Sequence, residues 1–385
     1  MASRIITTRS SLILLSSADI AISRPKRPAG FRDGFACTFG EWTVSAISRI
    51  NGEMRTISLF RILVALWLAV ETAPTRAAAE TLRIGLQTTG TFAWQLDVIR
   101  RHGLADHAGL DLKITQFASP DAAKLALNSD TVDLAVVDWL WVARARALGA
   151  KLLFYPYSSA VGAIMVKSDS PLHGIADLKG HVLGIAGGPL DKSWLIVQAA
   201  AIRQGVNLKR DTTLAYGAPP LISQKLQQGE AEASLNFWNF CAGLETQGYR
   251  RIFEVRDAEA ALGLTEPVAL LGYAFSEQFA ADHRSTVDRF IAAAQKADNI
   301  MLRSDQEWDA LRPLMNADDD KTFKAYRDRT REGMPRRSIA TEEADARALF
   351  KALASTGGAE LVGPSQELDP GLYYQLALQP TLPGE

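Results

Sequence analysis

The sequence has little cysteine and histidine. Of its 385 residues, two are Cys (Cys37 and Cys241) and five are His. The His residues form no spaced cluster with Cys or carboxylates, so we expect no metal, no cofactor and no catalytic group. The net charge of −1 offers no basic field for nucleic acid. Beyond residue 79, no apolar run approaches the ~20 residues of a membrane-spanning helix.

A short apolar run at residues 62–70 (ILVALWLAV) has the surroundings of a secretory signal peptide. Arg55 and Arg61 precede the run, Pro74 follows it, and three alanines stand just before Glu80. This order is typical of export signals, and nine residues are too few to span a bilayer. We therefore expect residues 54–79 to be removed and the protein to reach the periplasm by the general secretory route. A buried helix in a longer domain is the alternative.

Residues 1–53 are rich in Arg and have few acidic residues. We expect translation to start at Met54, which makes residues 1–53 a start-site artefact; a transit-like leader is the alternative. A chain cleaved before Glu80 keeps only Cys241, so it can form no internal disulfide. Export without disulfides fits a bacterial periplasmic protein whose core is large enough to need no covalent staples.

After Glu80, strand-like and helix-like segments alternate along the chain. Residues 82–86 and 110–117 have strand patterns, and residues 92–101 have helical spacing. Ser119 and Pro120 are typical of a helix start. The alternation begins again near residue 163 and ends in amphipathic helices. It predicts an α/β fold with a largely parallel sheet.

A repeat at an offset of 99 residues indicates two similar lobes. The segments that begin at Leu125 and Gln224 align without a gap, and the alignment pairs Asp133 with Glu232, Trp139 with Trp238 and Gly149 with Gly248. Two copies predict two α/β lobes rather than a solenoid. We assign residues 80–162 to lobe 1, 163–266 to lobe 2, and 267–385 to a return to lobe 1 plus C-terminal helices. The chain then crosses between lobes near residues 159–164 and 267–275, which leaves a cleft.

Four turns between a strand and a helix are predicted to line this cleft. Helix starts carry unpaired N–H groups and partial positive charge, so they suit ligands rich in acceptor atoms. Gly permits close approach of a ligand, and aromatic rings offer stacking surfaces. Ordinary packing of each Trp and a simple tight turn at each Gly are the alternatives. The hydroxyls of two serines at the first crossing could also bind a ligand. The candidate ligand-binding residues of the turns and the crossing are Thr89, Gly90, Thr91, Phe92, Asp138, Trp139, Ser158, Ser159, Gly187, Gly188, Lys192, Asn236 and Trp238.

Four stretches carry a family resemblance: LRIGLQ, VDLAVVD, VKSDSPLHGIADLKGHVLGIAGG and QQGEAEASLNFW. They resemble the nitrate/sulfonate/taurine and thiamine-precursor family of periplasmic solute-binding proteins. The resemblance implies the type II periplasmic-binding-protein fold, with two lobes, a hinge and a ligand between the lobes. It also implies delivery of a small solute to an ABC permease in the inner membrane, no enzymatic activity, and a monomer.

One departure from the family and two other functions stay open. Sulfonate binders generally use cationic side chains, whereas the four turns offer only Lys192, which leaves room for a neutral or aromatic solute. Relatives of this fold act as enzymes in the synthesis of thiamine pyrimidine and menaquinone precursors. Asp138 is a candidate base for such an activity, but no His falls on the four turns. A receptor that presents its closed form to a sensor protein is the third interpretation.

Overall fold

The computed structural model describes residues 79–317 and 319–377. The predicted leader and almost all of the predicted signal peptide lie outside the described residues. In the part that is described, no helix is both long enough and apolar enough to cross a membrane.

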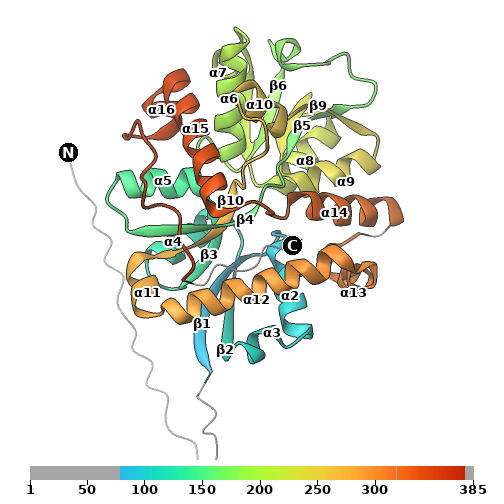
Figure 1. The fold of residues 1–385 in the computed structure, drawn as a ribbon. Helices are drawn as coiled ribbons and strands as arrows, with labels where there is room; N and C mark the ends of the chain where they lie inside the picture. Colours follow the sequence, from blue (N-terminus) through green and yellow to red (C-terminus); the bar gives the residue numbers. More distant parts are fainter. Residues whose placement is uncertain (1–78, 318, 378–385) are drawn as a thin grey trace, which may run out of the picture. The chain divides into compact units, whose positions relative to one another are not determined.

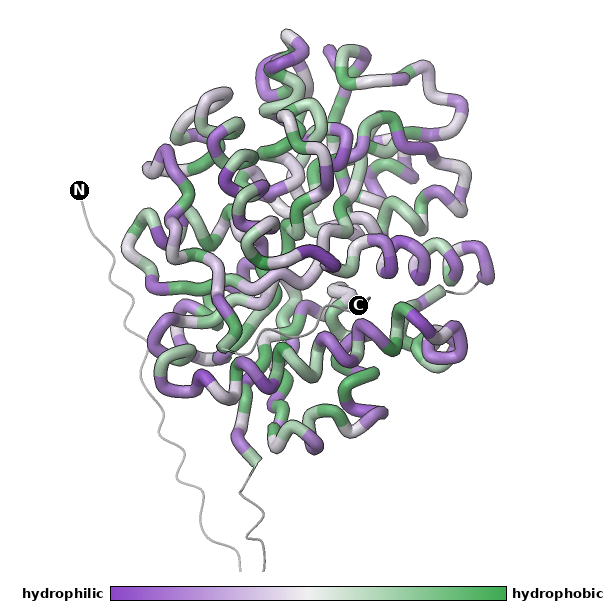
Figure 2. Tube along the Cα trace, in the orientation of Figure 1, coloured by the Kyte–Doolittle hydropathy of each residue, from purple (hydrophilic) through white to green (hydrophobic). Residues whose placement is uncertain are grey.

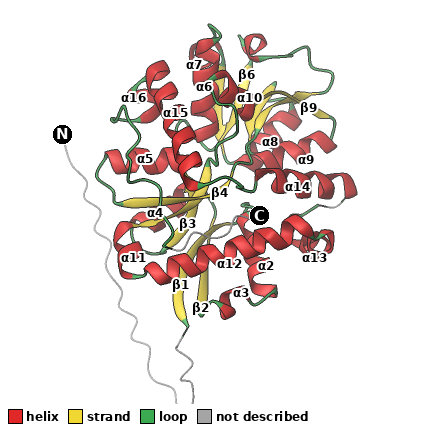
Figure 3. Cartoon of the chain, viewed as in Figure 1, coloured by secondary structure: helices red, strands yellow, loops and turns green. Residues whose placement is uncertain are grey.

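Two five-stranded mixed sheets form the centres of two lobes (Figures 1 and 3). The lobe 1 sheet has, in spatial order, β2 (Leu110–Phe117), β1 (Glu80–Gln87), β3 (Leu134–Asp138), β10 (Leu271–Ser276) and β4 (Leu152–Ser158). The lobe 2 sheet has β7 (Thr213–Gly217), β6 (Val182–Ala186), β8 (Ala233–Asn236), β5 (Ala163–Lys167) and β9 (Tyr249–Glu254). In each sheet the fourth strand is antiparallel to both neighbours, and the first three strands are parallel. The predicted α/β class is therefore confirmed.

Equivalent helices connect the parallel strands of the two lobes. Lobe 1 has α2 (Phe92–Arg101), α3 (Leu104–His107), α4 (Pro120–Asn128) and α5 (Trp139–Ala147). Lobe 2 has η1 (Ile175–Leu178), α6 (Lys192–Arg203), α7 (Leu208–Asp211), α8 (Pro219–Gln228), α9 (Trp238–Thr246) and α10 (Val255–Ala261). The predicted start of α4 is confirmed, because the Ser119 hydroxyl accepts the N–H of Ala122 at 3.2 Å and Pro120 is the first helical residue.

The structure confirms the repeat at the level of single hydrogen bonds. The Asp133 carboxylate accepts the backbone N–H of Arg83, 50 residues earlier, at 2.8 Å. The Glu232 carboxylate accepts the backbone N–H of Val182, also 50 residues earlier, at 2.8 Å. Each acid thus accepts a backbone N–H from the strand at the centre of its three parallel strands, β1 in lobe 1 and β6 in lobe 2, so the two lobes share this contact as well as a strand order.

The antiparallel strand of each sheet stands next to a crossing between the lobes. Residues 159–162 lead from β4 into β5, and residues 262–270 lead from α10 back into β10. The helices α11 (Glu277–Asp282), α12 (Arg284–Arg303), α13 (Asp305–Met315), α14 (Asp320–Gly333), α15 (Ile339–Gly357) and α16 (Ala359–Val362) follow. Of these, α12 and α13 pack on α2 of lobe 1, whereas α14 packs on α9 and α15 on α6 of lobe 2 (Figure 1). The C-terminal helices therefore cover both lobes.

The apolar core extends across both lobes. One buried cluster joins Trp139 of lobe 1, Trp194 of lobe 2 and Phe350 of α15. Figure 2 shows the outer helix α14 as largely hydrophilic, and only three of its residues, Thr322, Phe323 and Gly333, are buried. The lobes therefore share packing behind the cleft through α15, while polar helices cover the outside.

Candidate functional site

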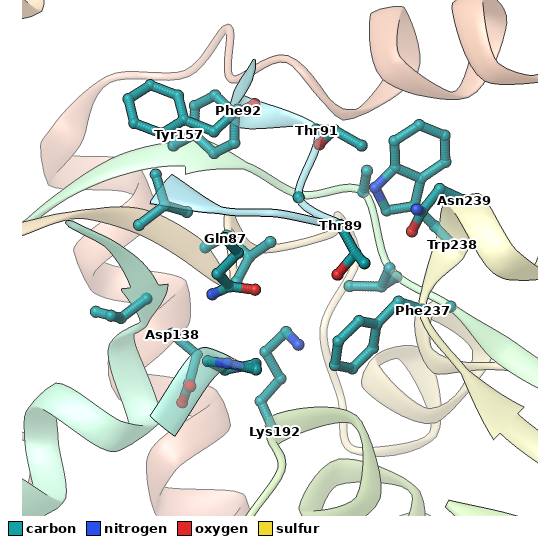
Figure 4. Close-up of a pocket in the computed structure, with 18 of the residues that line it drawn as sticks. Gln87, Thr89, Thr91, Phe92, Asp138, Tyr157, Lys192, Phe237, Trp238 and Asn239 are labelled. Carbon is teal, nitrogen blue, oxygen red and sulfur yellow. The ribbon is translucent and has the colours of Figure 1, made fainter. Parts of the chain in front are cut away.

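A cavity of about 100 Å³ lies between the two lobes (Figure 4). Lobe 1 contributes the end of β1, the turn to α2, the start of α4 and the end of β3. Lobe 2 contributes the starts of α6 and α9, and the first crossing passes along one side. The lining side chains with polar groups or rings are Gln87, Thr89, Thr91, Phe92, Lys124, Asp138, Tyr157, Asp191, Lys192, Ser193, Phe237, Trp238 and Asn239.

The structure brings together seven of the thirteen predicted residues. The turn from β1 to α2 and the starts of α5, α6 and α9 all reach the same cavity, as the repeat indicated. The seven that line it are Thr89, Gly90, Thr91, Phe92, Asp138, Lys192 and Trp238. Six of the predicted residues are not among those that line it: Trp139, Ser158, Ser159, Gly187, Gly188 and Asn236.

Trp139 and Asn236 face the protein interior. The Trp139 ring is fully buried, and its centre lies 6.5 Å from that of Phe350, so it offers no stacking surface to a solute. The Asn236 amide donates to the carbonyl of Pro219 at 3.0 Å and to the Ser223 hydroxyl at 2.9 Å. Its carbonyl accepts the N–H of Phe237 at 2.8 Å. Asn236 therefore fixes the turn between β8 and α9 and has little capacity left for a ligand.

Ser158, Ser159 and Gly187 have roles in the backbone conformation near the cavity. The Ser158 hydroxyl accepts the N–H of Ala160 at 3.1 Å, which shapes the start of the first crossing. The Ser159 N–H donates to the carbonyl of Gly333 at 2.8 Å. Gly187 has a φ of +93°, a left-handed conformation that favours glycine, and a Cβ there would lie 2.9 Å from the Asp191 carboxylate. Gly187 therefore forms a tight turn, which is the alternative to ligand binding that the sequence analysis gave for each glycine.

Lys124 is a lining residue that the sequence analysis missed. Its ammonium lies 3.2 Å from the Asp138 carboxylate, which also accepts the N–H of Trp141 at 2.7 Å and so caps α5. Burial acts to raise the pKa of Asp138, but the charges of Lys124 and Lys192 outweigh it, and the pKa is lowered. Burial acts to lower the pKa of Lys124, and Asp138 outweighs it. The two groups therefore form a charged pair at neutral pH.

Lys192 enters the cavity from lobe 2. Its ammonium lies 4.5 Å from the centre of the Phe237 ring and 3.6 Å from the nearer oxygen of Asp191. The Asp191 carboxylate accepts the N–H of Ser193 at 2.9 Å, which caps α6. Figure 4 shows the Lys192 nitrogen pointing into the open part of the cavity, towards Thr89 of lobe 1.

Aromatic rings form much of the remaining wall. On lobe 1, the Phe92 and Tyr157 rings lie edge to face with centres 5.6 Å apart, and both pack against Tyr273. Burial raises the pKa of Tyr157 well above its usual range, so its hydroxyl is neutral at physiological pH. On the side of lobe 2, the Trp238 ring packs edge to face against Trp94 at 6.1 Å. The cavity thus combines charged groups with rigid apolar walls.

The chemistry of the lining favours binding. None of the described lining residues is His or Cys, and the described part of the chain holds no group of three or more potential metal ligands. The two carboxylates each cap a helix, and Asp138 is also paired with Lys124. A base would need a free carboxylate within reach of a substrate proton. This arrangement could contact a small molecule through charge, hydrogen bonds and ring surfaces.

The comparisons with known proteins place this chain in a family. The model of the family described as "NMT1/THI5 like" matches residues 100–307. The chain belongs to the NMT1/THI5-like family. A curated relative from Escherichia coli (strain K12), named "Putative aliphatic sulfonates-binding protein", is 29% identical over 171 residues, which are 43% of this chain and 50% of the relative. The chain thus spans about half the length of the curated relative that it matches.

Solved structures of similar proteins confirm the fold. The alkanesulfonate-binding protein SsuA from Xanthomonas axonopodis pv. citri, solved with bound MOPS, has a TM-score of 0.62 at 20% identity and covers 77% of this chain and 99% of its own. The periplasmic aliphatic sulphonate-binding protein SsuA from Escherichia coli has a TM-score of 0.59 at 19% identity and covers 79% and 97%. The predicted two-lobed periplasmic-binding-protein fold of type II is thereby confirmed.

Proposed function

We propose that this protein is the periplasmic solute-binding component of an ABC importer and captures a small organic solute between its lobes. The observation that carries the proposal is the cavity of about 100 Å³, which both lobes line with polar groups and rings. A concave site with a few convergent polar groups is the usual form of a small-molecule site. The similarity to a putative aliphatic sulfonates-binding protein and to an alkanesulfonate-binding protein supports the same class of function.

The mechanism that we propose is closure of the two lobes around the solute. Residues 159–162 and 262–270 are crossings outside the helices and strands, and such segments can absorb a hinge rotation. A solute that contacts Thr89 of lobe 1 and Lys192 of lobe 2 binds the closed form better than the open form, so it shifts the population towards closure. The closed form is then the one that the membrane permease recognises, and a single protomer suffices for this cycle.

An enzymatic activity has less support from the geometry. Asp138, the candidate base, is only 6% exposed, and its carboxylate is paired with Lys124. Delivery of the closed form to a sensor protein instead of an importer would use the same cavity and the same closure. Neighbouring genes for a permease and an ATPase would favour the importer.

Thermal-shift measurements of the purified protein test the proposal. The panel contains sulfonates, pyrimidines, small alcohols and aromatic acids, and each mixture is also examined for products by mass spectrometry. A solute that binds only the folded state at ~100 times its Kd adds about 2.7 kcal/mol to the free energy of unfolding. We expect at least one class to stabilise the protein and to be recovered unchanged. Product formation would favour the enzyme, and stabilisation by no class would contradict the proposal.

A further inference from the structure

A short segment between two C-terminal helices contacts both crossings between the lobes. It runs from Gly333, the last residue of α14, to Glu342 in the first turn of α15, and we call it the α14–α15 junction. We call residues 159–162 the first crossing and residues 262–270 the return crossing. In Figure 1 the chain passes from α14 to α15 near the middle of the molecule, where the two lobes meet. The junction therefore lies where a rotation of one lobe against the other has to be accommodated.

The first crossing packs directly on the start of the junction. The Ser159 N–H donates to the carbonyl of Gly333 at 2.8 Å. A Cβ on Gly333 would lie 2.7 Å from the backbone nitrogen of Ala160 and 2.5 Å from its Cβ, so glycine permits an approach that a larger residue would prevent. The first crossing therefore cannot shift unless Gly333 moves with it or the contact is lost.

A buried carboxylate holds the return crossing to the other end of the junction. Glu342 is 2% exposed, and one of its oxygens accepts the N–H of Ala269 at 2.9 Å. Its other oxygen lies 3.3 Å from the guanidinium of Arg337, which also donates to the carbonyl of Pro267 at 3.4 Å. A buried donor or charge that loses its partner is costly. These contacts therefore favour one position of residues 267–269 relative to the junction.

Both lobes hold the helices that the junction connects. Arg331 of α14 donates to the carbonyl of Met301 in α12 at 2.9 Å and lies 2.7 Å from the carboxylate of Asp305 in α13. The helices α12 and α13 pack on α2 of lobe 1, whereas α14 packs on α9 and α15 on α6 of lobe 2. A rotation of the lobes therefore acts on the junction through its flanking helices as well as through the crossings.

The two crossings and the junction also border one cavity. This cavity of about 720 Å³ is lined by Ser159 of the first crossing, by Pro267 of the return crossing and by Met334 and Arg337 of the junction. Side chains that border a cavity can change position without displacing close-packed neighbours, whereas a filled core resists such changes. The three segments are therefore tied to one another and have room to move as a group.

We propose, on the basis of the function proposed above, that the α14–α15 junction is a third segment of the hinge. It couples the two crossings, so a change at one crossing is transmitted to the other. The contact of Glu342 with Ala269 favours the arrangement of the lobes seen in the structure, and its loss shifts the population towards other arrangements. Neither Glu342 nor Arg337 lines the cavity between the lobes, so both affect solute binding only through the hinge.

Hydrogen exchange in the first crossing tests the coupling, with no solute present. Glu342→Ala removes the acceptor of the Ala269 N–H on the return crossing and leaves the partner of the Ser159 N–H in place. We expect exchange in peptides that contain Ser159, followed by mass spectrometry, to become roughly 5- to 30-fold faster. Leu226→Ala, at a buried residue of α8, lowers stability without changing the junction and should not accelerate this exchange.

Distances between labels on the two lobes test the role in the hinge. Asp121→Cys on α4 and Leu190→Cys before α6 give exposed labels next to residues that line the cavity, and the natural Cys241 is buried. Pulsed electron-spin resonance of the protein without solute should show one main distance. Glu342→Ala should raise the ratio of other distances to the main one roughly 5- to 30-fold. Glu342→Gln keeps an acceptor for the Ala269 N–H and should have a smaller effect.

Arg337→Met is the second variant, and it decides if Glu342→Ala does not fold. It removes the contacts of this side chain with Glu342 and Pro267, so both measurements should change in the same direction as in Glu342→Ala. Glu343→Gln is the matched control, because Glu343 is the next residue on α15 and pairs with Arg347 of the same helix. It should change neither the exchange nor the distance.

The outcomes separate this inference from the proposed function. First-crossing exchange that responds to neither variant, or an interlobe distance that neither variant changes, would overturn the third hinge segment. Equal acceleration in Leu226→Ala would also overturn it, because the exchange would then report stability alone. In each of these cases, a distance that changes when a stabilising compound is added leaves the proposed closure standing. If the distance changes in no variant and with no compound of the thermal-shift panel, the proposed closure falls as well.

Discussion

The ammonium of Lys124 lies 3.2 Å from the carboxylate of Asp138, inside the cavity between the lobes. Removing the charge of Asp138 leaves a buried ammonium unpaired and weakens the cap of α5. We therefore expect Asp138→Asn to lower the free energy of unfolding by about 3 kcal/mol, as urea denaturation at pH 7 would measure. Asp169→Asn, at an exposed aspartate, is the matched control and should stay within about 0.5 kcal/mol of the original.

The pH dependence of this pair has a definite sign. The folded-state pKa of Asp138 is lowered by Lys124 and Lys192 against the effect of burial. A lowered pKa gives stability that is present above the unfolded value, ~3.9, and is lost as the pH falls through the folded value. The difference between the unmodified protein and Asp138→Asn should therefore shrink below pH ~4. A difference in the free energy of unfolding that stays constant from pH 3 to pH 7, measured at steps of about 1 pH unit, would contradict the ion pair.

Glu259 predicts the opposite pH dependence. Glu259 is 1% exposed, and no described residue gives either carboxylate oxygen a hydrogen bond of normal geometry, although the backbone N–H of Val268 acts to lower the pKa. Burial raises its pKa to about 8. A raised carboxyl pKa means that stability falls as the pH rises from the unfolded value, ~4.3, towards 8, because ionisation is costly in the folded state.

Glu259→Gln removes this ionisation, so the variant should be more stable than the original at pH 9 and should lose less stability between pH 5 and pH 9. Urea midpoints measured at both pH values would show it. An equal loss of stability in both proteins over that range would mean that Glu259 does not titrate there. Glu266→Gln, at an exposed glutamate on the crossing that follows α10, is the control and should follow the original protein.

The first crossing should be intolerant of a side chain at residue 162. A Cβ on Gly162 would collide with the backbone carbonyl of Asn236, and the Gly162 carbonyl accepts the N–H of Val255 at 3.0 Å. Gly162→Ala should therefore cost about 3 kcal/mol or more, since backbone atoms must move. Gly188→Ala, where a Cβ meets no atom within 4 Å, should be neutral or slightly stabilising. Comparable midpoints for the two variants would show that the crossing is looser than the structure indicates.

The repeat shows how much of the site the sequence could predict. The alternation of strands and helices and the 99-residue offset place Trp139 and Trp238 at equivalent helix starts, and the structure agrees. The two rings nevertheless have different surroundings. Phe350 of α15 covers Trp139, whereas Trp238 lines the cavity. The difference depends on Phe350, which lies more than 200 residues after Trp139 along the chain, so the local sequence pattern around each Trp cannot predict it.

Tertiary packing also explains why the sequence pattern does not predict Lys124 as a lining residue. Lys124 lies in the middle of α4, and only the packing of α4 beside β3 brings it to Asp138. The sequence predicts Asn236 to be a ligand-binding residue because it lies at a turn between a strand and a helix. In the structure its side-chain amide donates hydrogen bonds to Pro219 and Ser223 of α8 instead. Sequence pattern thus located the turns, while tertiary contacts determined which side chains face the cavity.

Trp238 belongs to the core and to the cavity wall at once. It is 6% exposed, and its ring centre lies 6.1 Å from those of Trp94 and Tyr326. Trp238→Ala should therefore destabilise the fold by about 3–5 kcal/mol as well as weaken binding, so it cannot isolate either role. Trp238→Phe keeps most of the packing. We expect it to fold and to bind a stabilising compound more weakly, and an unchanged Kd per folded molecule would assign Trp238 to the core alone.

The most direct test of the account is a crystal structure of the protein with a compound that stabilises it. We predict electron density for the compound in the cavity between the lobes, in contact with Thr89 or Thr91 of lobe 1 and with Lys192 or Phe237 of lobe 2. Density on only one lobe, or in the separate cavity of about 720 Å³ that includes Ser159 and Glu259, would contradict it.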